Sequence, residues 1–167
     1  MTQVLISIGS NKHNPQLQIE RAFSKLNERF ENVRMSSLYL TEPVGGIPQS
    51  EFINAAIRLD TQLNAHDLLQ FIMDIERQAH RNRSMEIPNG PRSLDLDIIL
   101  FGDEICSEPD LVIPHPRFRD RRFVLEPMQA IAPEVIDPVS NKSISQLLAE
   151  CTDLNWVKTM EAELLTQ

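Results

Sequence analysis

The spacing of hydrophobic positions changes several times along the chain, which predicts alternating strands and helices. Continuous or two-residue apolar patterns typical of strands occur at residues 4–9, 33–40, 52–60, 93–101 and 111–113. Three- and four-residue spacing typical of amphipathic helices occurs at residues 15–30, 64–80 and 143–151, and residues 123–132 are interpreted as helical or turn-like. This interleaving indicates a mixed α/β fold. Because 167 residues suit one domain, we expect a single domain over residues 1–167.

Two of the predicted helices carry clear start signals. Asn14 followed by Pro15 is typical of an N-cap and a first helical residue. Asn64, with Asp67 three residues later, is a second capping pattern. The Gly-Ser-Asn segment at residues 9–11 is interpreted as a turn, because it is not continued as the Gly-x-x-x-x-Gly-Lys-Ser/Thr of a phosphate loop.

The last long predicted strand carries two carboxylates in an otherwise apolar run. Side chains alternate faces along a strand, so Asp95 and Asp97 share one face. The apolar side chains share the other face: Leu94, Leu96 and Ile98. Adjacent carboxylates repel each other, and a hard cation such as Mg2+ relieves the repulsion. The alternative is a wet strand face that carries Asp only for solubility, although strands disfavour Asp.

Charge is distributed unevenly along the chain. The net charge of −8 opposes binding of nucleic acid by the molecule as a whole, so no nucleic-acid partner is expected. Eight of the twelve arginines nevertheless fall within residues 77–92 and 117–122. Arginine forks suit phosphate oxygens, and this concentration therefore favours a local phosphate-binding patch.

Three further polar side chains stand out by their positions. Glu76 falls on the apolar stripe of its predicted helix, which indicates a buried pair or a ligand contact. Asn54 lies among apolar strand residues, where it either bonds to local backbone or reads a ligand's donor and acceptor. His115 lies between two prolines that restrict it to an extended conformation. It is either an inert surface residue or a phosphate ligand beside the arginines.

The cysteines and the apolar runs bear on the compartment. Cys106 and Cys151 are isolated and form neither a metal-type spacing nor a disulfide framework, which favours a reducing cytoplasm. The first residues lack a secretory pattern, and no apolar run approaches the roughly 18 residues of a membrane span. We therefore expect a cytoplasmic protein without a membrane partner.

The clearest motif lies at residues 90–102 and reads Gly-Pro-Arg-Ser-Leu-Asp-Leu-Asp-Ile-Ile-Leu-Phe-Gly. It closely resembles the signature of the 6-hydroxymethyl-7,8-dihydropterin pyrophosphokinase family of folate biosynthesis. Further matching segments lie at residues 6–11, 52–56, 113–118 and 131–134. The resemblance implies an α/β (α+β) domain of ferredoxin-like type, with a mostly antiparallel central sheet flanked by helices. It also implies transfer of pyrophosphate from ATP to the pterin's hydroxymethyl oxygen, with release of AMP.

The resemblance further implies roles for individual residues. Asp95 and Asp97 are expected to hold two Mg2+ ions, with ATP as co-substrate. Catalysis is assigned to Arg81, Arg92, Asp95 and Asp97. ATP contacts are expected from Glu76, Arg81, Arg83, Arg92, Ile98, His115 and Arg121. Pterin contacts are expected from Thr41, Glu42, Val44, Phe52, Asn54 and Phe123. Loops 41–51 and 81–91 are expected to close as lids over these small-molecule substrates, on a chain that acts as a monomer.

Three positions differ from the family pattern. Asn89 stands where a Trp is frequent, Met73 where a Gln is frequent, and Asp110 where an Arg is frequent. The last change is expected to add negative charge near the phosphates. One alternative is therefore a paralogue that binds nucleotide or pterin with weakened catalysis. A metal-dependent glycosyl or nucleotidyl transferase is another alternative, but it leaves the arginine-rich loops unexplained.

Overall fold

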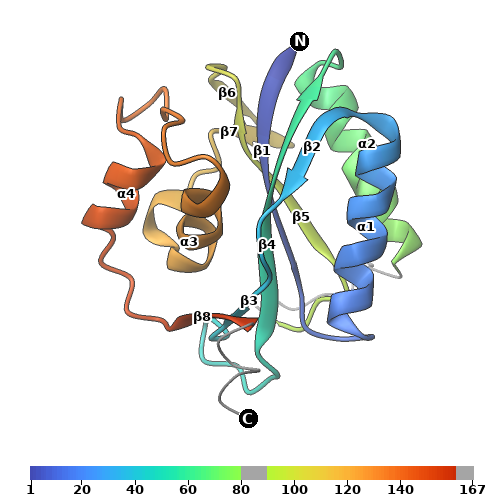
Figure 1. Cartoon of the computed structure of the whole chain (residues 1–167), viewed down its shortest axis with the longest axis vertical. Helices are drawn as coiled ribbons and strands as arrows, with labels where there is room; N and C mark the ends of the chain where they lie inside the picture. Colours follow the sequence, from blue (N-terminus) through green and yellow to red (C-terminus); the bar gives the residue numbers. More distant parts are fainter. Residues whose placement is uncertain (80–89, 161–167) are drawn as a thin grey trace.

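The computed structural model describes residues 1–79 and 90–160, in which a sheet lies between two helical layers (Figure 1). The strands are β1 (Thr2–Ser10), β2 (Glu31–Met35), β3 (Tyr39–Thr41), β4 (Phe52–Thr61), β5 (Asp95–Phe101), β6 (Cys106–Glu108), β7 (Leu111–Ile113) and β8 (Val157–Thr159). The helices are α1 (Pro15–Arg29), α2 (Ala65–Gln78), the 3-10 turn η2 (Phe118–Asp120), α3 (Arg122–Ile131) and α4 (Ile144–Glu150). None of the helices in the described ranges is long and apolar enough to cross a bilayer.

The main sheet has the strand order β5-β1-β4-β3-β8. Strand β2 also pairs with β4, at Ile57–Asp60, whereas β3 pairs with Phe52–Asn54 of the same strand. Every pairing among these described strands is antiparallel. In chain order, β1, α1, the β2–β3 pair, β4, α2 and β5 form a ferredoxin-like βαββαβ unit. The predicted α/β class with an antiparallel sheet flanked by helices is confirmed.

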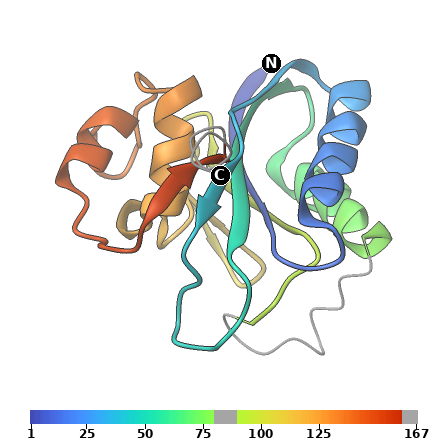
Figure 2. The same cartoon turned by 60° about the horizontal axis from the view of Figure 1, so that its bottom comes forward.

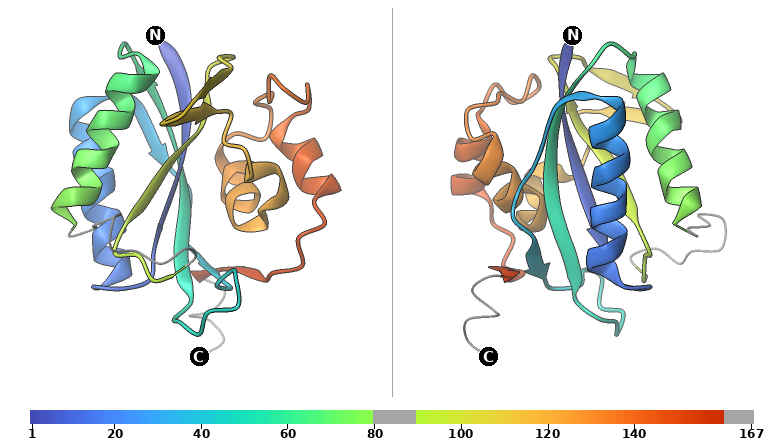
Figure 3. Two further views of the ribbon diagram at one scale, coloured as in Figure 1. Left: turned by 180° about the vertical axis from the view of Figure 1, so that it is seen from behind. Right: turned by 45° about the vertical axis from the view of Figure 1, so that its right-hand side comes forward.

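Helices α1 and α2 cover one face of the sheet, as the two views in Figure 3 show. The core beneath them contains Ile6, Ile19, Leu26, Leu68 and Ile72, each at most 1% exposed. Full burial of such a side chain contributes about 1.5–3 kcal/mol. This layer therefore holds the central strands in register.

The other face of the sheet is divided into a closed part and an open part. Along β1 it passes from Leu5, which packs in the cluster under α3 and α4, to Ser7 and Gly9, which line a cavity. Strands β4 and β5 change in the same way, from Ala56 to Asn54 and from Leu100 to Asp97. The same strands thus supply both the core and the polar floor of the cavity.

Strand β5 contains a β-bulge at the boundary between these two parts. Ile6 pairs with Ile98, and the preceding residue of β1 pairs with Leu100, so Ile99 is an extra residue. As a result Ile99 and Leu100 both pack toward α3 and α4. The carbonyl of Ile99 accepts the backbone N–H of His115 at 3.0 Å. The bulge therefore ties the segment after β7 to β5.

The strand predicted at residues 33–40 is wrong in one respect, because the structure divides it into β2 and β3. At the break, the N–H of Ser36 donates to the carbonyl of Ala56, and the N–H of Ala56 donates to Ser36 Oγ, each at 2.9 Å. A hydroxyl thus takes the place of a backbone carbonyl in the ladder. The chain leaves the sheet here and rejoins it at Tyr39.

The helix start signals have different outcomes. Asn64 caps α2 as predicted, because its side chain accepts the N–H of Asp67 at 2.8 Å. Asn14 precedes α1 but has a left-handed backbone (φ 62°), and its side chain makes no capping bond. Strands β6 and β8 were not predicted, since three-residue strands carry little periodic signal.

A buried ion pair anchors η2, the turn that leads into α3. Asp137 is 0% exposed and accepts bonds from Arg119 Nε at 2.6 Å and Nη2 at 3.0 Å. Burial raises the pKa of Asp137, but the bonds from Arg119 and Ser140 outweigh that effect and hold the pKa at about 2. The carboxylate is therefore charged at neutral pH and fixes the side chain of Arg119, the central residue of the turn.

We expect Asp137→Asn to lower the free energy of unfolding by about 3 kcal/mol, because it leaves the Arg119 guanidinium half-buried without its charge partner. Urea denaturation followed by circular dichroism measures the change. Glu134→Gln is the matched control, since Glu134 pairs with Arg58 with its side chain 63% exposed. It should cost no more than about 0.5 kcal/mol. Equal losses in the two variants would contradict the anchoring role.

Candidate active site

A cavity of about 350 Å3 opens where the face of the sheet changes from apolar to polar. Figure 2 turns this end forward, where β1 ends and β4 and β5 begin. The volume is typical of small-molecule sites. The predicted site residues that line the cavity are Thr41, Glu42, Val44, Phe52, Asn54, Arg92, Asp95, Asp97, His115, Arg121 and Phe123. The fold thus brings the predicted pterin contacts together with the aspartate pair and with Arg92, His115 and Arg121 of the predicted ATP contacts.

The two carboxylates at the start of β5 lie on the cavity face, as the strand pattern predicted. Asp95 pairs with Gly9 across the ladder, and Asp97 pairs with Ser7. Both aspartates are half-buried. Mg2+ typically takes one or two carboxylates and completes its shell with phosphate oxygens and water. Among the described residues no third His, Cys or acidic side chain is grouped with this pair, so the donor set fits a metal that a phosphate helps to hold.

Arg121 is electrostatically coupled to this pair. Burial lowers the pKa of Arg121, whereas the charges of Asp97 and Asp95 raise it. An arginine remains charged under such a shift. Its guanidinium carbon also lies 5.5 Å from the centre of the Phe123 ring. Arg121 therefore joins the acidic end of the cavity to its aromatic wall.

His115 is neutral in this environment. Burial lowers its pKa to about 4, and the charge of Arg121 acts in the same direction, while Asp95 acts against both. Its Nδ1 accepts the backbone N–H of Arg117 at 3.1 Å. In the neutral ring the proton is therefore on Nε2, which can donate to a phosphate oxygen.

A buried amide forms the other end of the cavity. Asn54 is 5% exposed, and its Nδ2 donates to Thr41 Oγ1 at 2.6 Å. Gly9 lies directly opposite, and a Cβ added there would lie 2.4 Å from Asn54 Oδ1. Only glycine leaves room for the amide in this position. The observed bond to the Thr41 side chain is not the local backbone bond of the first reading, and it orients the amide beside the cavity, while the ligand-reading role stays a prediction.

Asn11 connects the two loops at the rim, a role that the sequence pattern did not reveal. Its Oδ1 accepts the N–H of Arg92 at 2.7 Å, and its own N–H donates to the Arg92 carbonyl at 2.9 Å. Its Nδ2 donates to Gln49 Oε1 and to the carbonyl of Ser50 at 2.8 and 3.0 Å. Ser10 Oγ also bonds the Ser93 carbonyl. The segment interpreted as a simple turn is therefore a clamp between the Arg92 segment and loop 41–51.

Two predicted ATP contacts lie outside the lining of the cavity. Glu76 is 2% exposed, and its Oε2 accepts the N–H of Leu96 at 2.9 Å. Because β5 is the last strand in the order of described strands, this carboxylate satisfies an outward N–H of the edge. The side chain of Ile98 packs in the core cluster of the α1–α2 face. The predicted roles of both residues toward ATP stay predictions.

Some expectations fall where the structure is not described. Arg81, Arg83 and Asn89 lie outside the described residues, and so does most of the lid expected at residues 81–91. Met73 belongs to α2 and does not line the cavity.

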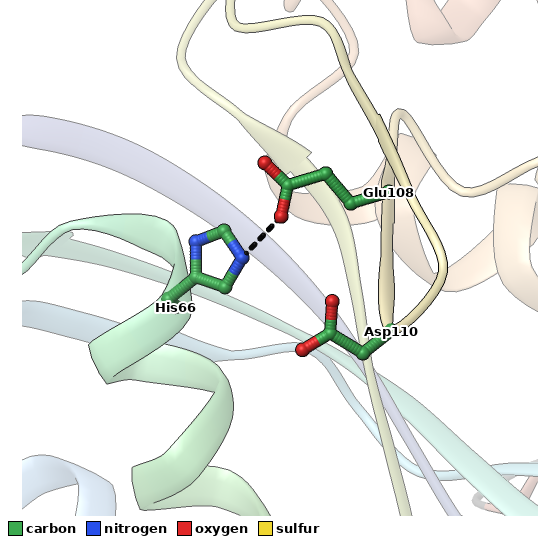
Figure 4. Close-up of side chains that lie close together, drawn as sticks. All are labelled: His66, Glu108 and Asp110. Atoms are coloured by element: carbon green, nitrogen blue, oxygen red, sulfur yellow. Dashed lines mark hydrogen bonds and ion pairs between the residues drawn. The ribbon is translucent and has the colours of Figure 1, made fainter.

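Asp110 lies between β6 and β7, at the other end of the sheet from the start of β5 that carries the aspartate pair (Figure 1). Figure 4 shows Asp110 beside His66 and Glu108. Its carboxylate is grouped with the exposed side chains of His66 and Glu108, and His66 Nε2 lies 2.6 Å from Glu108 Oε2. Asp110 is absent from the cavity lining. The structure therefore does not support the expectation that Asp110 adds negative charge beside the phosphates.

The sequence also missed several residues that line the cavity: Ser7, Gly9, Gly90, Ile99, Arg117 and Val124. The arginine-rich stretch at residues 117–122 pointed toward Arg117. Ser7 follows from the period of β1 once its register with Asp97 is known. Ile99 follows from alternation with Asp95 and Asp97, whereas Leu100 does not, because the bulge turns it to the same face as Ile99.

His115 gives a pH dependence with a defined sign. A folded pKa of about 4, below the unfolded value near 6.5, stabilises the fold above pH 6.5, and this stabilisation is lost as pH falls toward 4. Between pH 7 and pH 4, in EDTA, wild type should lose about 2 kcal/mol more unfolding free energy than His115→Asn, which keeps an acceptor for Arg117. Urea denaturation across this range measures both proteins. Parallel pH profiles would contradict the buried neutral state.

Comparisons with known proteins agree with the geometry. The family model for 7,8-dihydro-6-hydroxymethylpterin-pyrophosphokinase (HPPK) matches residues 5–133. The chain is 38% identical over 152 residues to the 2-amino-4-hydroxy-6-hydroxymethyldihydropteridine pyrophosphokinase of Pseudomonas aeruginosa, covering 89% of this chain and 91% of the relative. It is 37% identical over 132 residues to the protein of the same name from Bacillus subtilis, covering 78% of each.

A solved structure of Plasmodium falciparum HPPK-DHPS matches with a TM-score of 0.66 at 17% identity, which supports the fold. That match covers 90% of this chain and 43% of the other, so this chain spans less than half of the solved protein. The family model covers more than half of this chain, and the two curated relatives align over most of their own length. The chain therefore belongs to the HPPK family.

Proposed function

We propose that this protein transfers the pyrophosphoryl group of ATP to 6-hydroxymethyl-7,8-dihydropterin, releasing AMP, as a step of folate biosynthesis. The observation that carries the proposal is one cavity with an Asp pair and cations at one end and a buried amide with aromatic rings at the other. In the reaction, the pterin hydroxyl oxygen attacks the β-phosphorus, and the bond from that phosphorus to the α,β-bridging oxygen breaks. AMP leaves, and the hydroxyl proton is released.

The triphosphate binds at the acidic and basic end of the cavity. Arg92 and Arg121 neutralise phosphate oxygens, and His115 donates its Nε2 proton to another. Arg81 and Arg83 contribute further positive charge. Phosphoryl transfer needs positioning and charge neutralisation more than covalent chemistry. Three of these side chains are positioned by described elements: His115 by the bulge of β5, Arg121 by the start of α3 and Arg92 by Asn11.

Asp95 and Asp97 hold Mg2+, and we propose two ions. When bound, Mg2+ neutralises phosphate charge and lowers the pKa of a coordinated hydroxyl. The chain's own contribution is the rigid spacing of the two carboxylates on one strand face. Their location beside Ser7 and Gly9 leaves them open to the cavity, while the apolar side chains of the same strands stay buried under the helices.

The pterin binds at the amide end. Asn54 offers a donor and an acceptor to the ring edge, in an orientation that Thr41 and Gly9 fix. Phe52 and Phe123 supply aromatic surface for stacking. Backbone groups between Thr41 and Val44 add further bonds. A pterin held in this way directs its hydroxymethyl group toward the phosphates.

We propose that the protein works as a single-domain, cytoplasmic monomer. ATP and the pterin are its small-molecule substrates.

The deciding experiment is AMP release from ATP by the purified protein, with and without Mg2+ and the pterin. We expect AMP only when both are present. Asp95→Asn and Asp97→Asn should lower turnover by about three orders of magnitude or more while folding survives, because the lost charge acts on the transition state.

Asp103→Asn is the matched control, since Asp103 is exposed in the turn after β5 and should leave turnover near wild type. AMP formation by both cavity variants at normal rates would overturn the metal assignment. A wild type that binds ATP and pterin without forming AMP would instead identify the binding-only paralogue.

Gly9→Ala tests the amide end separately. The new methyl group would displace the Asn54 side chain and break its bond to Thr41, so the KM for pterin should rise about tenfold or more. Affinity for an ATP analogue should stay within about threefold of wild type, because the atoms nearest the added Cβ belong to Asn54 and Ile53 and not to Asp95, the other partner of Gly9. Steady-state kinetics and calorimetry measure the two quantities. An unchanged KM for pterin would rule out Asn54 as the ring-reading group.

A further inference from the structure

The segment 151–160, here called the C-terminal strap, lies beyond the last residue matched by the family model, Pro133. It leaves α4, runs past the start of α3 and ends as β8 beside β3 (Figures 1 and 2). Both elements that it reaches carry residues of the cavity lining. Thr41 and Glu42 belong to the β3 side, and Arg121 and Phe123 belong to the α3 side.

One end of the strap holds the start of α3. Asp153 Oδ2 accepts the N–H of Arg122 at 2.9 Å, at the first residue of the helix. The N-cap residue Arg121 makes no side-chain capping bond, so Asp153 supplies both an acceptor and a negative charge at this helix end. Arg122 also returns bonds to the carbonyls of Asp153 and Cys151, at 3.0 and 3.2 Å. This end of the strap therefore fixes the residues on either side of Arg122.

The other end of the strap holds the start of loop 41–51. Strand β8 pairs antiparallel with β3. Beyond that pairing, the N–H of Glu42 donates to the Trp156 carbonyl at 3.1 Å, and the N–H of Trp156 donates to Glu42 Oε2 at 3.0 Å. The Glu42 carboxylate, predicted to contact the pterin, thus holds the strap. Its position at the cavity wall depends on that bond.

We propose that the C-terminal strap positions the two pterin-binding walls relative to each other, with Asp153 and Glu42 as its positioning residues. This inference rests on the proposed function. A strap fixed at both ends limits the separation of the α3 start and loop 41–51, and so limits the width of the pterin end. The phosphate end depends less on the strap, because the bulge of β5 holds the His115 segment and Asn11 holds the Arg92 segment, so the strap reaches it only through Arg121. Loss of the strap should therefore weaken pterin binding more than binding of an ATP analogue.

A substitution at Lys158 can break the pairing of β8 with β3 at one backbone hydrogen bond. Hydrogen-bonded pairs alternate along an antiparallel ladder. The N–H of Met160 donates to Leu38, and Glu42 bonds to Trp156, so the pair between them, Leu40 and Lys158, is also a hydrogen-bonded one. Lys158→Pro removes the backbone donor. Lys158→Ala keeps the donor and loses only an exposed side chain that lies 5.0 Å from the Trp156 ring centre, so it is the matched control.

Calorimetric titration of the pterin, in Mg2+ and a non-hydrolysable ATP analogue, tests the proposal. Lys158→Pro and Asp153→Ala should each raise the pterin Kd about tenfold, with the Kd of the analogue within about threefold of wild type. Lys158→Ala should remain within about twofold. The double variant should resemble the weaker-binding single variant, because a strap released at one end no longer restrains the other.

Several outcomes would overturn the proposed positioning role of the strap. These are an unchanged pterin Kd in the folded single variants, equal weakening of pterin and analogue, or single effects that multiply to about a hundredfold in the double variant. If Lys158→Pro does not fold, Asp153→Ala decides alone. If the wild type binds pterin but forms no AMP, the proposed activity is wrong. The comparison of pterin Kd values among the variants still tests the positioning role of the strap. A wild type that binds no pterin overturns both.

Discussion

The antiparallel register of β1 against β4 and β5 is the constraint on which the active site depends. Gly9 pairs with Asn54 on one side and with Asp95 on the other, so one position of β1 sets the distance between the amide and the acidic pair. A slip of one residue would turn every side chain to the opposite face. The register is held by the apolar rows of the same strands, which pack under both helical layers. Burial of the core therefore determines where the polar groups of the cavity lie.

The cavity contains both acidic and basic side chains, and each set needs a ligand of opposite charge. The molecule carries a net charge of −8, so attraction of ATP must come from a local field. Arg121 is coupled to the charges of the two aspartates and lies over the ring of Phe123, and burial keeps the nearby His115 neutral. A charged histidine there would add repulsion among the cations, whereas the neutral ring still donates one bond. A complex of ATP with Mg2+ brings an anion for the arginines and cations for the aspartates, so it satisfies both halves together.

The sequence predicted the elements with long periodic patterns and the face of β5 that carries Asp95 and Asp97. It failed where a single residue changes a pattern. Ser36 interrupts a strand because its hydroxyl replaces a backbone carbonyl, and Leu100 changes face because Ile99 is inserted as a bulge. Neither effect has a signal in hydropathy. The clamp made by Asn11 was missed for another reason: its partners lie far away in the chain, and only the folded register brings them together.

The two ends of the cavity are supported by different parts of the chain. The phosphate end rests on β1, β5 and the segment tied to the Ile99 carbonyl, all within residues matched by the family model. The pterin end rests on β3, a three-residue strand that β4 pairs on one side and β8 pairs on the other. So short a strand makes few bonds of its own, and its neighbours decide where loop 41–51 begins. Changes in the C-terminal strap can therefore alter recognition of the pterin while Arg92, His115 and the aspartate pair keep their places, since the strap reaches the phosphate end only through Arg121.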